Sequence, residues 1–283
     1  KGAASDRQKD LLFKSVLDGW RIGNAGPERG SKNTLELKAR ITRKGDQSVI
    51  DGQKFYSTGA LFAHWVAVKA LNDEGRPVMA FVRRGTPGLR IVDDWSGFGQ
   101  RTTASGTVLL DQVQVDNDLV VDIWRQSEVP NIQGAVSQLI QAAIDAGIAE
   151  AAVTETIAFV RERARPWIDA KVERASDDLY VIADIGRLQL ELHAAQALLA
   201  KAARTLDEVD AGPLDATAAA RASIAVAEAK VLTTEIALQA SEKLFELAGS
   251  RATLAEFNLD RHWRNARVHT LHDPVRWKYH AVG

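Results

Sequence analysis

The stretch NIQGAVSQLIQAAIDAGIAEAAVTETIAFVRERAR, residues 131–165, decides the class of fold. Its apolar residues recur every three or four positions, which is the spacing of an amphipathic helix. No proline interrupts the pattern before Pro166, where a helix cannot easily continue. The stretch therefore predicts a helix about 30 residues long, a length typical of a large helical bundle rather than of an average domain.

The same texture continues to the end of the chain. Residues 176–212 begin with a serine and acidic residues, which suit a helix start, and end at a Gly-Pro step. Residues 215–249 run from an aspartate to a glycine, and a shorter stretch, residues 254–271, ends before Asp-Pro. Each segment carries one apolar stripe, so the pattern predicts a C-terminal four-helix bundle.

Towards the N-terminus the texture changes. Residues 5–17 predict a short helix that is too short to stand alone, and we expect it to be the remnant of a larger N-terminal helical domain, largely absent from this sequence. Residues 34–115 alternate apolar and polar positions between glycines and prolines, as in a β sandwich or open barrel. We expect an α+β multidomain chain: the remnant over 1–20, a middle antiparallel β domain over 21–128 and the bundle over 129–283.

Composition excludes several classes of function. Lys plus Arg is 36 and Asp plus Glu is 37, so global charge favours neither nucleic acid nor an anionic membrane as a partner. The chain has no cysteine, which excludes disulfides, zinc knuckles and a thiol nucleophile. No apolar run reaches the about 18 residues of a membrane span, and the first residues lack a signal-peptide pattern. We therefore expect a cytoplasmic protein.

Four of the six histidines lie in the last 22 residues, in a tail that includes HTLHDP, residues 269–274. His269 and His272 are three positions apart, so on a helix they face the same way and could bind a metal or transfer protons. Histidine is also favoured at helix C-termini by the helix dipole, and spacing alone favours this structural explanation. Only Asp273 is available nearby as a third ligand, so no metal site is predicted.

Three other segments have both a functional and a structural interpretation. The arginines of RERARPW, residues 161–167, could bind a phosphate. A solvated cationic helix end explains the three arginines slightly better. FYSTGA, residues 55–60, offers Ser57 or Thr58 at a strand end, where turn chemistry is the favoured explanation. GFGQRTTASG, residues 97–106, is a turn-rich connector and not a phosphate loop. The motifs of serine hydrolases, P-loop NTPases and zincins are absent.

The order of the predicted helical and β regions resembles that of the acyl-CoA dehydrogenase fold. Two segments support this resemblance: VIDGQKFYSTGALFAHWVAV (49–68) and FNLDRHWRNARVHTLHDP (257–274). The closer resemblance is to its flavin-dependent monooxygenase branch, typified by dibenzothiophene monooxygenase and the SfnB-type sulfur-acquisition oxidoreductases. GNAGPERGSKN, RPWIDA and IQAAIDAGIAEAA share that character. The resemblance covers nearly the whole chain from about residue 11.

The chain departs from the dehydrogenases at the place where many carry a catalytic glutamate, which removes the substrate's α-proton. By resemblance His272 fills that place. In the dehydrogenases, two segments help to hold the adenylate part of FAD. By resemblance RARPW and LFELAGS take the places of these segments, and their different sequences suit FMN better than FAD.

The resemblance implies a two-component monooxygenase that takes FMNH2 from a separate reductase and oxygenates a sulfur compound, as in desulfurization, through a C4a-hydroperoxyflavin. Two alternatives remain: an FAD-dependent acyl-CoA dehydrogenase with its base elsewhere, and a non-catalytic scaffold of the same fold. A homotetramer is implied as well.

The resemblance also implies roles for single residues. His272 would hydrogen-bond or protonate the peroxide, and His269 and Asp273 would orient it. Asn24 and Ser57 would lie near the flavin ring, and Trp95 and Ser105 would flank the ring and ribityl chain. The implied phosphate ligands are Arg251 with either Arg163 or Arg165, and Asp273 is also counted with the cofactor-binding residues.

Overall fold

The computed structural model describes residues 3–33 and 36–283. It divides into two compact units, each considered by itself below. The β unit comprises Lys1–Gly97 and Arg101–Val129, and the helical unit comprises Phe98–Gln100 and Pro130–Gly283. In the part of the chain described, no helix is long and apolar enough to cross a membrane.

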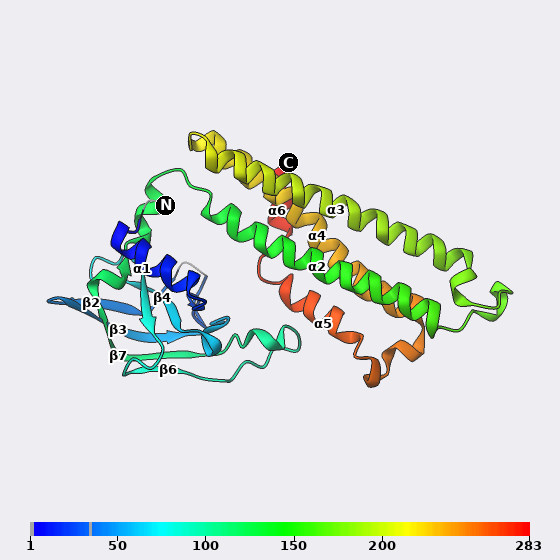
Figure 1. Cartoon of the computed structure of the whole chain (residues 1–283), viewed down its shortest axis with the longest axis horizontal. Coiled ribbons are helices and arrows are strands. Elements are labelled where there is room, and N and C mark those ends of the chain that lie inside the picture. The colour runs from blue at the N-terminus through cyan, green and yellow to red at the C-terminus, as the bar shows by residue number, and fades with distance from the viewer. Residues whose placement is uncertain (1–2, 34–35) are drawn as a thin grey trace. The chain divides into compact units, whose positions relative to one another are not determined.

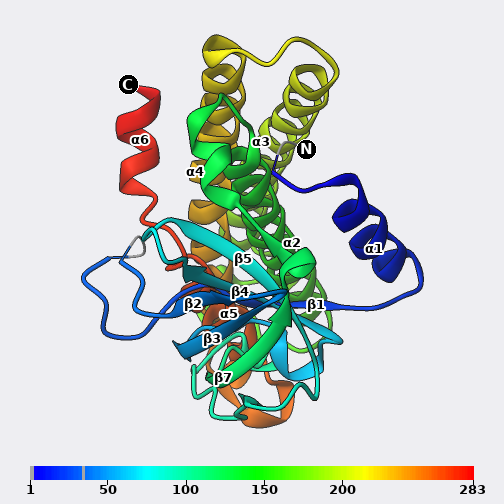
Figure 2. The ribbon, with the colours of Figure 1, turned by 90° about the vertical axis from the view of Figure 1, so that its left-hand side faces the viewer.

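The β unit contains one eight-stranded sheet, in the order β6-β7-β3-β2-β4-β5-β8 with β1 paired to β4 (Figure 2). Most neighbours are antiparallel, as expected, but β1 and β2 each pair with β4 in parallel. All the described strands belong to this one sheet. The strands are β1 Ile22–Ala25, β2 Arg40–Lys44, β3 Gln47–Lys54, β4 Trp65–Leu71, β5 Pro77–Arg83, β6 Leu89–Ile91, β7 Val108–Asp116 and β8 Val120–Val121.

Alternating side chains of these strands form the core of the β unit. Val66 and Ala70 of β4 pair with Val82 and Val78 of β5, and all four lie in one buried cluster. The hairpin between them turns at Asn72, whose side-chain oxygen accepts hydrogen bonds from the following backbone, as the Asn-Asp-Glu-Gly turn predicts. The strand expected from residue 34 begins only at Arg40; Thr34 and Leu35 lie outside the described residues.

The predicted first helix is present as α1, Asp6–Leu17. Ser5 and Gln8 form a capping box, in which each side chain accepts a hydrogen bond from the other's backbone N–H. The Gln8 side chain also donates to the backbone oxygen of Val120 at 2.9 Å, which ties the helix to the end of the sheet.

Three long helices dominate the helical unit: α2 Gln133–Glu162, α3 Leu179–Ala211 and α4 Ala216–Ala248 (Figure 1). All three follow the predicted segments. Asp178 and Asp215 cap α3 and α4, and Gly249 ends α4 with a positive φ of 76°. Fully buried alanines such as Ala149, Ala152 and Ala237 lie in their shared core, where single methyl groups let the helices pack closely.

The end of the chain differs from the prediction. The fourth helix, α5, spans only Asp260–His269, because Asn258 adopts a left-handed conformation (φ 49°) that ends the preceding short 3-10 turns. A further helix, α6 Arg276–Val282, follows Pro274 and was not expected. Pro274 has no backbone N–H to give, which is tolerated just before a helix start.

Gly85 and Gly88, in the β5–β6 connection, allow the cost of backbone strain to be measured apart from the cost of steric crowding. Both have positive φ, but a Cβ at Gly85 would meet nothing within 4 Å, whereas one at Gly88 would lie 2.0 Å from the backbone oxygen of Asp111. We expect Gly85→Ala to lower the free energy of unfolding by about 1 kcal/mol. Gly88→Ala should cost about 1 to 3 kcal/mol more. Equal effects in urea unfolding would contradict this packing.

Candidate active site

A row of hydroxyl groups lies where β3 leaves the sheet. Thr58 Oγ1 is 2.8 Å from Ser105 Oγ, which is 2.7 Å from Thr103 Oγ1. Ser57 is buried, and its backbone N–H donates to Gly106 at 3.1 Å. Its Oγ has no hydrogen-bond partner among the described residues. Because an unpartnered buried hydroxyl is costly, this atom suits a polar group of a ligand.

The structure brings two further expected residues to the same region of the β unit. The backbone N–H of Asn24 donates to Thr58 at 2.9 Å, and its side-chain oxygen accepts from Gly26 at 3.1 Å. The Trp95 ring lies 6.2 Å from the Tyr56 ring, and Tyr56 precedes Ser57 with a φ of 60°. Of the residues expected near the flavin ring, Asn24, Ser57 and Ser105 converge most closely.

A buried ion pair that the sequence did not reveal holds the loop after Asn24. Lys54 is fully buried, and its ammonium lies 2.7 Å from Glu28 Oε1. Glu28 also accepts from the backbone N–H groups of Lys38 and Ala39. Burial alone would raise the pKa of Glu28, but the hydrogen bond and charge of Lys54 hold it below its ordinary value. The only sequence signal is a lysine at an inward-facing position of β3.

Two of the expected phosphate ligands meet in the helical unit. Arg163, which caps α2, lies 5.2 Å from the centre of the Phe257 ring, and Arg251 lies 5.7 Å from it. Both side chains are thus placed by one aromatic ring. Arg165 is exposed, and no contact with another described residue fixes its side chain. The geometry therefore favours Arg163 over Arg165 as the partner of Arg251.

His272 and Asp273 form a hydrogen-bonded pair just after α5. His272 Nδ1 lies 2.8 Å from Asp273 Oδ2, which also accepts from the side-chain amide of Gln138 on α2 at 2.5 Å. These hydrogen bonds lower the pKa of Asp273 to about 2, although burial opposes the shift. Asp273 is therefore an anion at neutral pH, and His272 presents its Nδ1–H to it, which leaves Nε2 for other work.

His269 has a different carboxylate partner. Its Nδ1 lies 2.5 Å from Asp145 Oδ1, while Asp145 Oδ2 is 2.6 Å from Lys230 Nζ and 2.9 Å from Thr234 Oγ1. Asp145 and Lys230 are fully buried. The sequence analysis missed both, and their signal was a lone charge within an apolar helix face. His269 and His272 thus lie at the end of one helix on separate carboxylates.

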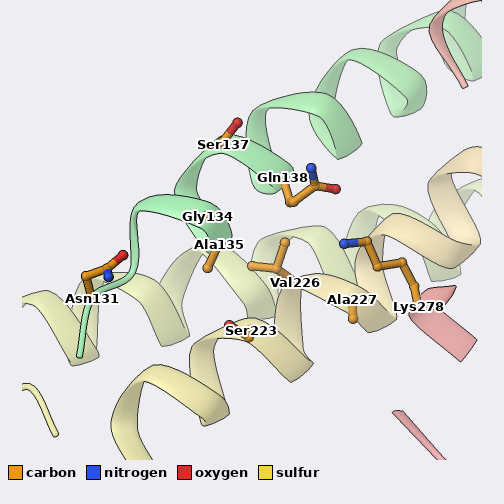
Figure 3. Close-up of a pocket in the computed structure, with 9 residues that line it drawn as sticks. All are labelled: Asn131, Gly134, Ala135, Ser137, Gln138, Ser223, Val226, Ala227 and Lys278. Atoms are coloured by element: carbon orange, nitrogen blue, oxygen red, sulfur yellow. The ribbon is translucent and has the colours of Figure 1, made fainter. Parts of the chain in front are cut away.

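A cavity of about 390 Å³ in the helical unit is lined by the first turns of α2, by α4 and by Lys278 of α6 (Figure 3). Gln138 belongs to its wall, and the amide oxygen of this residue is buried without a partner among the described residues. Ser223 and Val226 line the opposite wall from α4. One residue therefore joins the cavity to the carboxylate that holds His272.

The pairing of His272 with Asp273 can be tested without any ligand. In His272→Ala we expect the pKa of Asp273 to rise from about 2 towards its ordinary value, because its first hydrogen-bond donor is lost. Carboxyl carbon NMR as a function of pH measures this. The depressed pKa stabilises the fold above the unfolded pKa and is lost as pH falls towards 2, so the variant should be less sensitive to acid over that window. An unchanged pKa would contradict the pairing.

Comparison with known proteins places the chain. Residues 139–277 match the family model for the acyl-CoA dehydrogenase C-terminal domain. The chain is 32% identical to a dibenzothiophene monooxygenase of Rhodococcus erythropolis, covering 99% of this chain and 70% of the relative. It is also 32% identical to a probable FMNH2-dependent monooxygenase, SfnC, of Pseudomonas putida, covering 98% of this chain and 70% of that protein.

Solved structures agree. The crystal structure of FMN-bound TdsC, a dibenzothiophene monooxygenase of Paenibacillus sp. A11-2, superposes with a TM-score of 0.93 at 30% identity, covering 99% of this chain and 74% of that one. The sequence resemblance to this branch is confirmed. The chain belongs to the flavin-dependent monooxygenases that share the acyl-CoA dehydrogenase fold.

Proposed function

We propose that this chain oxygenates the sulfur atom of a small organic compound, with reduced FMN as its cofactor. The observation that carries the proposal is the His272–Asp273 pair. A base for a dehydrogenase must take a proton from carbon, whereas an imidazole on an ionised carboxylate suits hydrogen bonding and proton transfer to oxygen. Relatives named for FMNH2 and for dibenzothiophene support the cofactor and the class of substrate.

The residues of each unit fit FMN. In the β unit, the unpartnered Ser57 Oγ is a hydrogen-bonding group for the flavin ring, with Asn24 beside it. Trp95 and Ser105 would contact the ring and the ribityl chain. In the helical unit, Arg163 and Arg251 would bind the phosphate, since guanidinium groups match phosphate oxygens in geometry and charge.

When bound, reduced FMN supplies the two electrons with which one atom of O2 enters the sulfur compound and the other leaves as water. The chain's own contribution is the control of protons. Asp273 fixes His272 Nδ1–H, so that His272 Nε2 is the atom that gives or takes a proton. The side-chain amide of Gln138 on α2 donates a hydrogen bond to Asp273. His269 is the last residue of α5, three positions before His272.

The same proposal includes the assembly and its partners. A separate flavin reductase would supply FMNH2, and the enzyme would work in the cytoplasm, in keeping with the absence of cysteine. We propose a homotetramer built through the helical unit, because Leu179, Tyr180 and Leu190 of α3 are 70% or more exposed.

His272→Ala tests the proposed function directly. With enzymatically supplied FMNH2 and dibenzothiophene, we expect its kcat for sulfur oxygenation to fall at least about 100-fold, the usual value of a proton-transfer group. FMN binding should change little. His193→Ala on α3 is the matched control and should retain full activity, because this exposed histidine has a hydrogen bond to Gln189 and to no other described residue. Full activity of His272→Ala would refute the assignment.

The choice of cofactor has its own test. Titration should show tighter binding of FMN than of FAD, and Arg163→Ala and Arg251→Ala should each weaken FMN binding by about tenfold, the value of one charge-assisted hydrogen bond. Arg165→Ala serves as the control, because that exposed side chain has no orienting contact in the part of the chain that the structure describes. Tighter binding of FAD, with bleaching of the flavin by an acyl-CoA, would instead support an acyl-CoA dehydrogenase.

A further inference from the structure

Like Lys230 of α4, Asp145 in the fourth turn of α2 is a fully buried charged group of the helical unit. It is 0% exposed, and both carboxylate oxygens are occupied. Oδ1 faces His269 at the end of α5, and Oδ2 faces Lys230 and Thr234 on α4. One carboxylate therefore joins three helices.

Such a group is expensive unless it is fully paired. Moving a carboxylate and an ammonium out of water costs several kcal/mol per ion, and apolar side chains of similar volume are often as stable or more stable. Apart from buried hydroxyl groups such as that of Thr233, the buried core of the bundle is mainly apolar, as in the cluster that contains Ala149, Leu192 and Ile236. Because apolar pairs of similar volume are often as stable at such positions, packing alone does not explain the charge.

The reason lies in what the carboxylate does to His269. An ionised carboxylate only accepts hydrogen bonds, and burial, which would favour the neutral acid, is outweighed by the hydrogen bond of His269 and the charge of Lys230, so that the pKa of Asp145 lies below its ordinary value. The proton of the imidazole must then reside on Nδ1. Nε2 has no hydrogen-bond partner among the described residues, and the side chain is 11% exposed.

We infer that Asp145, held by Lys230 and Thr234, is a positioning residue that fixes His269 as its Nδ1–H tautomer and leaves His269 Nε2 as the atom available for proton transfer. The inference rests on the proposed function, since it gives His269 a part in the same chemistry. Lys230 acts through Asp145: its charge keeps the carboxylate ionised in the apolar core.

The same network fixes the segment that carries His272. The backbone N–H of His272 donates to the backbone oxygen of His269 at 3.0 Å. The His269 side chain is bonded to Asp145 and therefore fixes the end of α5. His272 lies three residues beyond that end. Two imidazoles are thus placed by two carboxylates, one buried and neutralised by lysine, the other partly exposed and held by Gln138.

The tautomer can be observed in the protein without flavin. With nitrogen-15 only in the histidine rings, two-bond proton–nitrogen spectra at about pH 8.5, where an ordinary imidazole is neutral, distinguish the two tautomers. The His269 signal is identified by its loss in His269→Gln. We expect the Nδ1–H form in the wild type and the more usual Nε2–H form in Asp145→Leu with Lys230→Met, which replaces the ion pair by apolar side chains.

A matched control neutralises an exposed pair on the same helix. Lys243→Met with Glu246→Leu removes an ion pair of 2.7 Å at the surface of α4 and should leave the His269 signal unchanged. If the Leu/Met variant does not fold, Asp145→Asn with Lys230→Met takes its place and should show a loss of the pure Nδ1–H form. An Nε2–H form in the wild type, or a tautomer unaffected by removal of the pair, would overturn the inference.

Activity gives a second readout. With FMNH2 and dibenzothiophene, the Leu/Met variant should lower kcat by about tenfold or more with little change in KM, and adding His269→Gln should lower it no further, because both changes act through one group. Additive losses, or an unchanged kcat, would contradict the positioning role. A wild-type enzyme inactive on sulfur compounds would refute the proposed function, while the tautomer measurement would still decide this inference.

Discussion

The helical unit depends on one buried ion pair, Lys230 with Asp145, which lies where α2, α4 and α5 meet. Every partner of Asp145 must be in place at once, because a carboxylate left unpaired in an apolar core would cost several kcal/mol. The pair therefore restricts the register of the helices and the direction in which α5 ends. This restriction also determines where the imidazoles of His269 and His272 lie.

The β unit uses the same device. Lys54 and Glu28 form a second buried pair, and Glu28 also accepts hydrogen bonds from two backbone N–H groups of the loop before β2. The loop it holds runs on from Asn24, and Lys54 lies three residues before Ser57. In each unit a buried charge thus fixes irregular backbone from which candidate functional side chains extend, and regular helices and strands supply the support.

The long helices and one hairpin turn could be predicted from the sequence, because the spacing of apolar residues and the capping and turn residues determine them. The three long helices show apolar stripes and capping residues, and Asn72 marks its hairpin turn. Asp145 and Lys230 could not be predicted, since a single charge in an apolar stripe gives no hint of a partner 85 residues away. The start of α5 was missed because Asn258 breaks a pattern that still looks helical. His269 and His272 were expected to act together, but only their separate carboxylates reveal how each is oriented.

Under the proposed function, these constraints would suit the two histidines to proton control near oxygen rather than to removal of a proton from carbon. The most direct measurement is the fate of labelled oxygen. The enzyme would be given FMNH2, dibenzothiophene and ¹⁸O2, and the product analysed by mass spectrometry. The account predicts one ¹⁸O atom in the sulfoxide formed, with the second recovered as water. Consumption of FMNH2 that yields only labelled hydrogen peroxide, with unmodified dibenzothiophene, would contradict it.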